Sequence, residues 1–202
     1  GGNPGLTSIS TVSNFPNLNT LWLGFQNIAS FSAISSLSSL QVLGLRGCSV
    51  SDSDFAVVSS LSQLYGIDVG SNQLTSLDPL TTITPMSLLV ASSNAISDIS
   101  AISGLTNLSA LLLDHNNITD IQPLVDNAGL CCDDGIIVTS NPLTQTAVCN
   151  EAPTIQQRMT TGNFTIDVTC GNSQTLTMSV TGTGATTPAA GQTLFNTGDV
   201  AQ

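Results

Sequence analysis

Apolar residues recur along this chain with a period of 22 residues. In the segment that starts at residue 108, leucine or isoleucine stands at positions 1, 4, 6, 11, 14 and 17, and asparagine stands at position 9. The same spacing occurs in segments that start at residues 18, 40, 64 and 86, so five copies follow one another up to residue 129. A single copy cannot bury its own apolar positions, but a stack of copies can.

This spacing is that of a leucine-rich repeat. It predicts a leucine-rich repeat solenoid of the α/β horseshoe type, with a parallel concave β-sheet and a convex side of short 3₁₀ or irregular segments. Neighbouring strands should lie about 4.8 Å apart. Four copies have 22 residues, and the second, residues 40–63, has 24, with Ser51-Asp52-Ser53-Asp54 accommodating the extra pair.

The pattern divides the chain into three parts. Residues 1–129 hold a partial first turn, in residues 1–17, and the five repeats. Residues 130–170 are expected to form a final repeat around residues 135–143, a helix or irregular segment at 154–159, and a last strand at 164–169, which together make a C-terminal cap. Residues 171–202 alternate apolar and polar residues between glycines, and this predicts a β-rich tail that begins a second module.

Equivalent positions in successive repeats form columns, and one of these columns is polar. An asparagine that follows the strand can satisfy backbone groups of its own turn and of the adjacent turn, and losing such a buried partner costs about 1–3 kcal/mol. Cys48 occupies this column in the second repeat, as a buried thiol, and Gln26 occupies it in the first. The predicted structural column is Cys48, Asn72, Asn94, Asn116 and Asn141.

Four of the five cysteines fall in the cap: Cys131, Cys132, Cys149 and Cys170. Two disulfides that join Cys131 and Cys132 to Cys149 and Cys170 would close the end of the solenoid, with the pairing left open. The alternative is a metal site, which the adjacent cysteines and the absence of a nearby histidine disfavour. This cysteine usage favours an oxidising compartment.

The charge balance restricts the partners. The chain carries two arginines, no lysine and a net charge of −11, which argues against nucleic acid and anionic membranes as partners. No apolar run is long enough to span a membrane. The first residues show no methionine and no signal-like region, and this suggests a processed or excised piece. No cofactor and no metal is expected.

The candidate binding face lies on the concave side. Neighbouring strand residues point to opposite faces, so the residue between the two core positions of each strand points outward, and successive turns place these residues in a row that spans roughly 24 Å. Interface-forming residue types and an apolar stripe gather there. The predicted partner-binding residues are Trp22, Phe25, Arg46, Tyr65, Asp68, Leu88, Val90, Leu112, Asp114, His115 and Ile137. Strand propensity alone, or cover by the chain's own tail, would explain the same stripe without a partner.

The sequence gives weaker support for catalysis, calcium binding and an ice- or carbohydrate-binding array. Asp114 and His115 offer a base and a carboxylate, but adjacent strand residues diverge and no nucleophile is singled out, so no enzyme activity is predicted. The acidic pairs at residues 52 and 54 and at 133 and 134 lack the spacing of a calcium loop. Sequons stand at Asn107, Asn117 and Asn163. The Ser and Thr residues form no regular column, which disfavours an ice- or carbohydrate-binding array.

The repeat resembles that of the bacterial internalins. Ile96-Ser97-Asp98-Ile99 and Ile118-Thr119-Asp120-Ile121 match the I-x-D-I part of that repeat, and Asn141-Pro142-Leu143 is similar to the closing turn of secreted bacterial leucine-rich repeat proteins. Residues 175–184 resemble the start of a small extracellular β-repeat. The resemblance implies a secreted or cell-surface protein that binds a partner through the concave sheet. The cysteines in the cap and the lack of lysine depart from it, so no partner and no binding residue is carried over.

Two hypotheses follow. The first is an extracellular recognition or adhesion module that binds a protein or glycan on a cell or extracellular surface. The alternative is a structural subunit that self-assembles end to end, through its open ends, into a fibre or surface layer.

Overall fold

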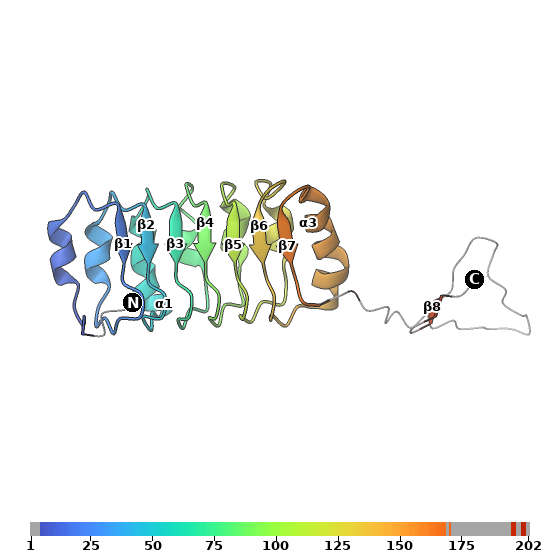
Figure 1. The fold of residues 1–202 in the computed structure, drawn as a ribbon, viewed down its shortest axis with the longest axis horizontal. Helices are drawn as coiled ribbons and strands as arrows, with labels where there is room; N and C mark the ends of the chain where they lie inside the picture. The colour runs from blue at the N-terminus through green and yellow to red at the C-terminus, as the bar shows by residue number, and fades with distance from the viewer. Residues whose placement is uncertain (1–4, 169, 171–194, 197–198, 201–202) are drawn as a thin grey trace, which may run out of the picture. The chain divides into compact units, whose positions relative to one another are not determined.

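The computed structural model describes residues 5–168, 170, 195–196 and 199–200, and the chain divides into two compact units, Gly1–Val168 and Thr169–Gln202. The first unit contains the repeats and the cap (Figure 1). In the second unit, β8 (Phe195–Asn196) and β9 (Asp199–Val200) pair in antiparallel fashion. Most of the predicted β-rich tail, residues 171–202, lies outside the described residues.

The first unit is built on a seven-stranded parallel sheet whose strands follow one another in chain order. Each strand has three residues, and its middle residue is one of the repeated apolar positions, which points into the core. The predicted leucine-rich repeat solenoid is confirmed, with its 3₁₀ segments behind the sheet (Figure 1). The strands are β1 (Thr20–Trp22), β2 (Val42–Gly44), β3 (Gly66–Asp68), β4 (Leu88–Val90), β5 (Ala110–Leu112), β6 (Gly135–Ile137) and β7 (Asn163–Thr165).

The return segments are short, as a 22-residue period requires. Five are 3₁₀ helices: η1 (Ser10–Asn14), η2 (Ser32–Ser36), η3 (Ala56–Ser60), η4 (Asp78–Leu80) and η5 (Ser100–Gly104). A short α-helix, α1 (Asp52–Phe55), directly precedes η3 in the second repeat, and α2 (Gln122–Asp126) takes the place of a 3₁₀ helix in the fifth. The extra residues of the second repeat form α1, because Ser51 and Asp54 make a capping box at its start.

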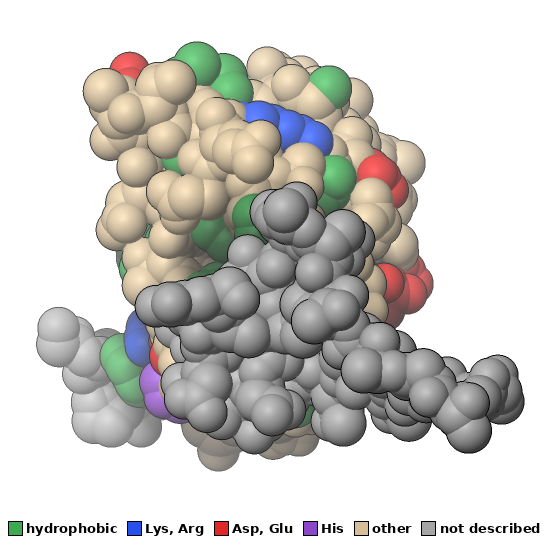
Figure 2. Space-filling model, turned by 90° about the vertical axis from the view of Figure 1, so that its right-hand side faces the viewer, with side chains coloured by type: hydrophobic (Ala, Val, Ile, Leu, Met, Phe, Trp, Pro, Cys, Tyr) green, Lys and Arg blue, Asp and Glu red, His purple; other side chains and the backbone are tan. Residues whose placement is uncertain are grey.

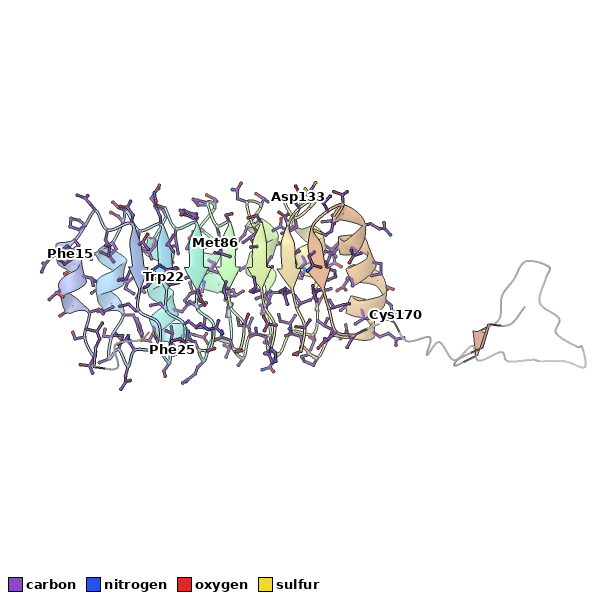
Figure 3. All side chains as sticks on the ribbon, viewed as in Figure 1. Phe15, Trp22, Phe25, Met86, Asp133 and Cys170 are labelled. Carbon is purple, nitrogen blue, oxygen red and sulfur yellow. The ribbon has the colours of Figure 1, made fainter. Side chains whose placement is uncertain are left out.

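The core is a continuous stack of leucine and isoleucine side chains between the sheet and the return segments. From Ile34 to Val138 nearly all of these positions are fully buried. Phe15 belongs to the same periodic series but is 60% exposed, because it lies in the first turn (Figure 3). Apolar burial along the stack is therefore the main source of stability, at about 25 cal/mol per Å².

The asparagine column joins each turn to the one before it. The Asn116 amide donates to the carbonyl of Leu113 in its own turn (2.9 Å) and to that of Ala91 in the preceding turn (3.0 Å). Its Oδ1 accepts from the Ile96 N–H at 3.0 Å. Asn72, Asn94 and Asn141 repeat this arrangement.

Cys48 and Gln26 fill the column differently. The Cys48 thiol donates to the Leu23 carbonyl at 2.9 Å, and burial raises its pKa against smaller, opposing backbone hydrogen bonds from Gln26 and Phe25. The Gln26 amide donates only within its own turn, to the carbonyls of Gly24 and Phe25. Its buried Oε1 has no hydrogen-bond partner among the described residues.

The cap continues from β6 through a π-helical turn, η6 (Ala147–Glu151), into α3 (Ala152–Arg158) and then β7. Glu151 is buried, and its Oε2 accepts from the backbone N–H of Ile121 at 3.1 Å. Burial raises the pKa of Glu151, and the carboxyl groups of Asp120 and Asp126 raise it further against the Ile121 hydrogen bond. The Arg158 guanidinium donates to the carbonyls of residues 125 and 127.

The cysteines of the cap differ from the prediction. Cys149 and Cys170 are disulfide-bonded, whereas Cys131 and Cys132 are free thiols, so both expected bridges, which would join Cys131 and Cys132 to Cys149 and Cys170, are wrong. The Cys132 N–H donates to the carbonyl of Arg158, at the end of α3. Cys149 precedes Arg158 by nine residues of helix, more than about 10 Å along its axis. A disulfide needs Cα atoms within about 7 Å, so Cys132 cannot reach Cys149.

Candidate functional site

The strand register brings the predicted binding residues together on one surface. Trp22, Gly44, Asp68, Val90, Leu112, Ile137 and Thr165 are paired from strand to strand across the whole sheet. We call this row, with the first residue of each strand and the solvent-accessible residues just before and after the strand, the strand face. It includes all the predicted partner-binding residues.

Among the residues whose exposure the structure describes, the two most exposed aromatic side chains lie in the first turn. Trp22 is 62% exposed and Phe25 is 63% exposed. Each lies over a glycine of the next turn, because a Cβ added to Gly44 would come within 1.9 Å of Trp22 Cε3, and one added to Gly47 within 2.6 Å of Phe25 Cδ1. These glycines leave room for the rings against the backbone of the second turn. Both side chains lie at the N-terminal end of the sheet (Figure 3).

Arg46 repeats this arrangement one turn later. Its Nη1 would lie 2.5 Å from a Cβ added to Gly70, and it is 3.8 Å from Asp68 Oδ1. The same Asp68 oxygen accepts from the Gly70 N–H at 2.9 Å. Because the Arg46 side chain is 39% exposed, solvent screens the ion pair, and the pair contributes little to the stability of the fold. The guanidinium is thus placed over the backbone of the third turn, near Asp68.

The middle of the face is apolar. Tyr65, just before β3, is 46% exposed, and Leu88 is 39% exposed. Val90, Leu112 and Ile137 stand side by side in register and are half-buried. Medium-sized side chains in adjacent strands therefore cover one another in part and form a continuous apolar row.

Polar groups lie beside this row. The Asp114 carboxylate accepts from the Ser92 hydroxyl through Oδ1 and faces His115 Nδ1 at 3.0 Å through Oδ2. Partial burial works to raise the pKa of Asp114, but these hydrogen bonds outweigh it and hold the pKa below its usual value. Serine activation requires the hydroxyl to donate to an imidazole, and here it donates to the carboxylate. The Asp114 carboxylate therefore contacts both the exposed imidazole of His115 and the Ser92 hydroxyl, which donates to the carboxylate and not to the ring.

The spacing of residues along the chain does not predict the backbone conformation that presents several of these side chains. The residue that ends each strand turn has a left-handed backbone: Phe25, Gly47, Ser71, Ser93, His115 and Ser140 have φ between 55° and 65°. The spacing also does not predict the pairing of each large side chain with a glycine in the same column of the next turn. Aligning the repeats column by column would have exposed both patterns, since Gly44, Gly47 and Gly70 interrupt columns of larger residues.

The remaining candidates have structural partners. Asp52 accepts from the backbone and hydroxyl of Thr75, and Asp134 accepts from the Cys131 N–H. In the part of the chain that the structure describes, no three His, Cys, Asp or Glu side chains converge as a metal site. Within the same residues, none of the helices has the length and apolar character of a membrane span. Where Figure 2 shows the described residues, the surface is mainly uncharged, with acidic side chains at separate places near its margin.

Comparison with known proteins finds solved structures that share this fold. No protein-family model and no curated protein matches the chain. Among solved structures, internalin C2 from Listeria monocytogenes is similar over 74% of this chain and 74% of its own, with 24% identity and a TM-score of 0.61. A second L. monocytogenes internalin matches 71% of this chain and 47% of its own, with 26% identity and a TM-score of 0.56.

A leucine-rich repeat protein from Leptospira interrogans is similar over 78% of this chain and 38% of its own, with 21% identity and a TM-score of 0.62. The chain therefore spans less than half the length of two of these three proteins. At these identities, the likeness establishes a common leucine-rich repeat fold, with internalins among its structural neighbours.

Proposed function

We propose that this chain is a recognition module of an extracellular or cell-surface protein and that it binds a protein partner through the strand face. The observation that carries the proposal is the clustering of exposed large apolar side chains. Six such residues are found among the described ones, and Trp22, Phe25, Tyr65 and Leu88 lie on the strand face. Clusters of this kind mark interaction sites, and aromatic and arginine side chains are the usual energetic anchors of interfaces.

The net charge and the exposed residue types restrict the class of partner. A chain of net charge −11 with two arginines does not provide the basic surface that nucleic acids and anionic membranes require. The aromatic pair, Arg46 and the apolar row instead suit a protein surface with an apolar centre. The fold shared with internalins agrees with a binding role and with a secreted or surface location. Binding, rather than catalysis, is the proposed activity.

A panel of purified extracellular protein domains and a glycan array, both probed with the full chain, would test the proposal. For any ligand found, the triple variant Trp22→Ser, Val90→Ser, Leu112→Ser should lose binding by at least about 100-fold, since each anchor contributes about 1–2 kcal/mol or more. Phe15→Ser is the matched control, because Phe15 is equally exposed but lies away from the strand face. Its affinity should be unchanged.

Two results would contradict the proposal. One is a ligand whose affinity falls with Phe15→Ser and not with the triple variant. The other is light scattering that shows growth into large species with concentration, unaffected by the triple variant but abolished by changes in residues 1–17 or 171–202. The second result would support end-to-end assembly. If the chain binds glycans and no protein domain, the partner is a carbohydrate and the proposed protein partner is wrong.

A further inference from the structure

The charged side chains of the strand face are mostly acidic. The chain has two arginines and no lysine, and the Arg158 guanidinium donates to two carbonyls in the cap, so Arg46 is the arginine that lies on this face. Its guanidinium lies 3.8 Å from the Asp68 carboxylate, which compensates its charge. The acidic residues of the face include Asp68, Asp114, Asp134 and Asp167. A surplus of negative charge therefore remains, and it lies in the second half of the sheet.

Asp114 and Asp167 occupy the same column of the strand face. Leu112 in β5 pairs with Ile137 in β6, and Ile137 pairs with Thr165 in β7, so each aspartate lies two residues beyond the end of its strand in equivalent turns. The two residues are thus two strand spacings apart, roughly 10 Å. They lie along one side of the second half of the apolar row.

Both carboxylates are held in place by protein donors. Asp114 accepts from the Ser92 hydroxyl and faces His115 Nδ1 at 3.0 Å, and Asp167 Oδ2 accepts from the Ser140 N–H at 2.6 Å. An ionised carboxylate has about four acceptor positions. These bonds therefore orient the two groups and leave acceptor positions for a cationic side chain of a partner.

The aromatic end of the strand face favours the same kind of partner. Trp22 and Phe25 are 62% and 63% exposed, and each ring lies against a glycine of the next turn, Gly44 or Gly47 (Figure 3). The glycine side of each ring is covered, and the other side is open to solvent. An ammonium or guanidinium within about 6 Å of the centre of such a ring is attracted to its face. Cations are thus favoured at both ends of the strand face.

The charge of the whole chain acts in the same direction. The net charge is −11, and at physiological ionic strength the field of a charge extends about 8 Å into the solvent. Such a field attracts a cationic protein as it approaches and repels an anionic one. The charge on the strand face and the charge of the chain therefore select the same class of partner.

We infer that the partner of the strand face is a basic protein surface, with lysine or arginine side chains next to an aliphatic centre. This rests on the proposed function, since it specifies the chemistry of the partner bound at the same surface. The aliphatic groups meet the apolar row, and the cationic groups meet Asp114 and Asp167 on one side and the rings of Trp22 and Phe25 at the end. Complementary charge of this kind raises the rate of association and the selectivity for the partner.

A phage-displayed library of random peptides, selected on the full chain at physiological salt, tests the inference. Peptides of about 12 residues reach about 40 Å when extended, which exceeds the roughly 29 Å across the seven strands. Clones that fail to bind the triple variant Trp22→Ser, Val90→Ser, Leu112→Ser are those that contact the strand face. Relative to the unselected library, these clones should be enriched in lysine and arginine and depleted in aspartate and glutamate.

Two matched double variants locate the effect, with the affinity of the synthesised peptides measured by biolayer interferometry. Asp114→Asn with Asp167→Asn should weaken the strand-face peptides by about tenfold, the combined effect of two exposed ion pairs at the upper end of their usual strength. Asp98→Asn with Asp120→Asn is the control, because it removes the same charge from exposed residues outside the strand face. It should leave the affinity unchanged. Asparagine keeps an acceptor oxygen at all four positions, and thermal unfolding shows that each variant is folded.

Three outcomes would overturn the inference. If the strand-face peptides show no excess of cationic residues, or tolerate the changes at Asp114 and Asp167, the partner is not basic and the proposed function still stands. If both double variants weaken the peptides equally, the attraction is to the net charge of the chain and not to this face. If every clone binds the triple variant as well as the wild type, the proposed function fails together with the inference.

Discussion

Replacing Gly44 with alanine should displace the Trp22 indole from the sheet. The added Cβ would lie 1.9 Å from Cε3, 2.5 Å from Cζ3 and 2.8 Å from Cδ2 of Trp22. Real Cβ atoms do not approach so closely, so either the backbone or the ring must move. The backbone of β2 is bonded on both sides in the sheet, while Trp22 is largely exposed, so the ring moves.

The energetic cost follows from the burial of the ring. A little over a third of Trp22 is buried, which for an aromatic residue of roughly 250 Å² is on the order of 90 Å². At about 25 cal/mol per Å² this contact contributes about 2 kcal/mol as an upper limit. Alanine in a strand recovers about 0.5–1 kcal/mol relative to glycine. We therefore expect Gly44→Ala to fold, with a loss of about 1 kcal/mol in the free energy of unfolding.

Fluorescence reports the movement directly, because Trp22 is the only tryptophan. In Gly44→Ala its emission should shift to the red and acrylamide should quench it more strongly. Gly135→Ala is the control, since Gly135 is also a strand glycine but a Cβ there would meet nothing within 4 Å. If Gly44→Ala keeps the wild-type emission and quenching, the indole does not rest on Gly44, and the account of how the strand face is built is wrong.

Three further substitutions test the stack and its cap. Asn116→Ala should lower the free energy of unfolding in urea by about 2 kcal/mol, because buried groups in two turns lose their partner; the exposed neighbour Asn117→Ala should change it by under about 0.5 kcal/mol. The pKa of Glu151 is raised in the folded protein, so folding favours the protonated carboxyl group. Its contribution to stability is complete below the unfolded pKa of about 4.5 and is lost as the pH rises through the folded pKa. Glu151→Gln should therefore raise the unfolding temperature relative to wild type at pH 7 and lose that advantage in acid, as seen in melting curves across pH. Ser51→Ala should cost about 1 kcal/mol in a urea titration, through loss of the α1 capping box; an equal cost for Ser53→Ala would count against this.

The sequence was sufficient for the repeat architecture because the apolar spacing is a direct consequence of stacking. Leu43, Ile67 and Leu89 can be buried only if each lies against its equivalent in the next turn, so the register of the strands follows from the alignment of the copies. The strand limits were less certain. The last strand was expected at residues 164–169, whereas β7 ends at Thr165, because the pairing with the three-residue β6 sets its length.

The details of the cap and of the strand face depend on three-dimensional distance, which spacing along the chain does not provide. The position of Cys132 next to the end of α3 arises from the path of the helix, and no pattern of cysteines reveals it. The position of Trp22 over Gly44 likewise requires knowing that the indole leans towards the second turn. Only the columns themselves, once aligned, indicate that a large residue and a glycine are neighbours.

Strand spacing explains why the two halves of the strand face differ. Turns lie about 4.8 Å apart, which is less than the length of an indole, a phenyl ring or a guanidinium. A large side chain must therefore cover part of the next turn, and the same column there must be small, as Gly44, Gly47 and Gly70 are. Residues of the size of Val90, Leu112 and Ile137 fit side by side without this condition, and so they form a row whose members shield one another. The aromatic end consequently offers rings with one face open, while the apolar row offers a continuous ridge. A partner that engages both must match an open aromatic surface at one end and a narrow aliphatic row at the other, and this requirement favours a protein surface over a repeating polymer.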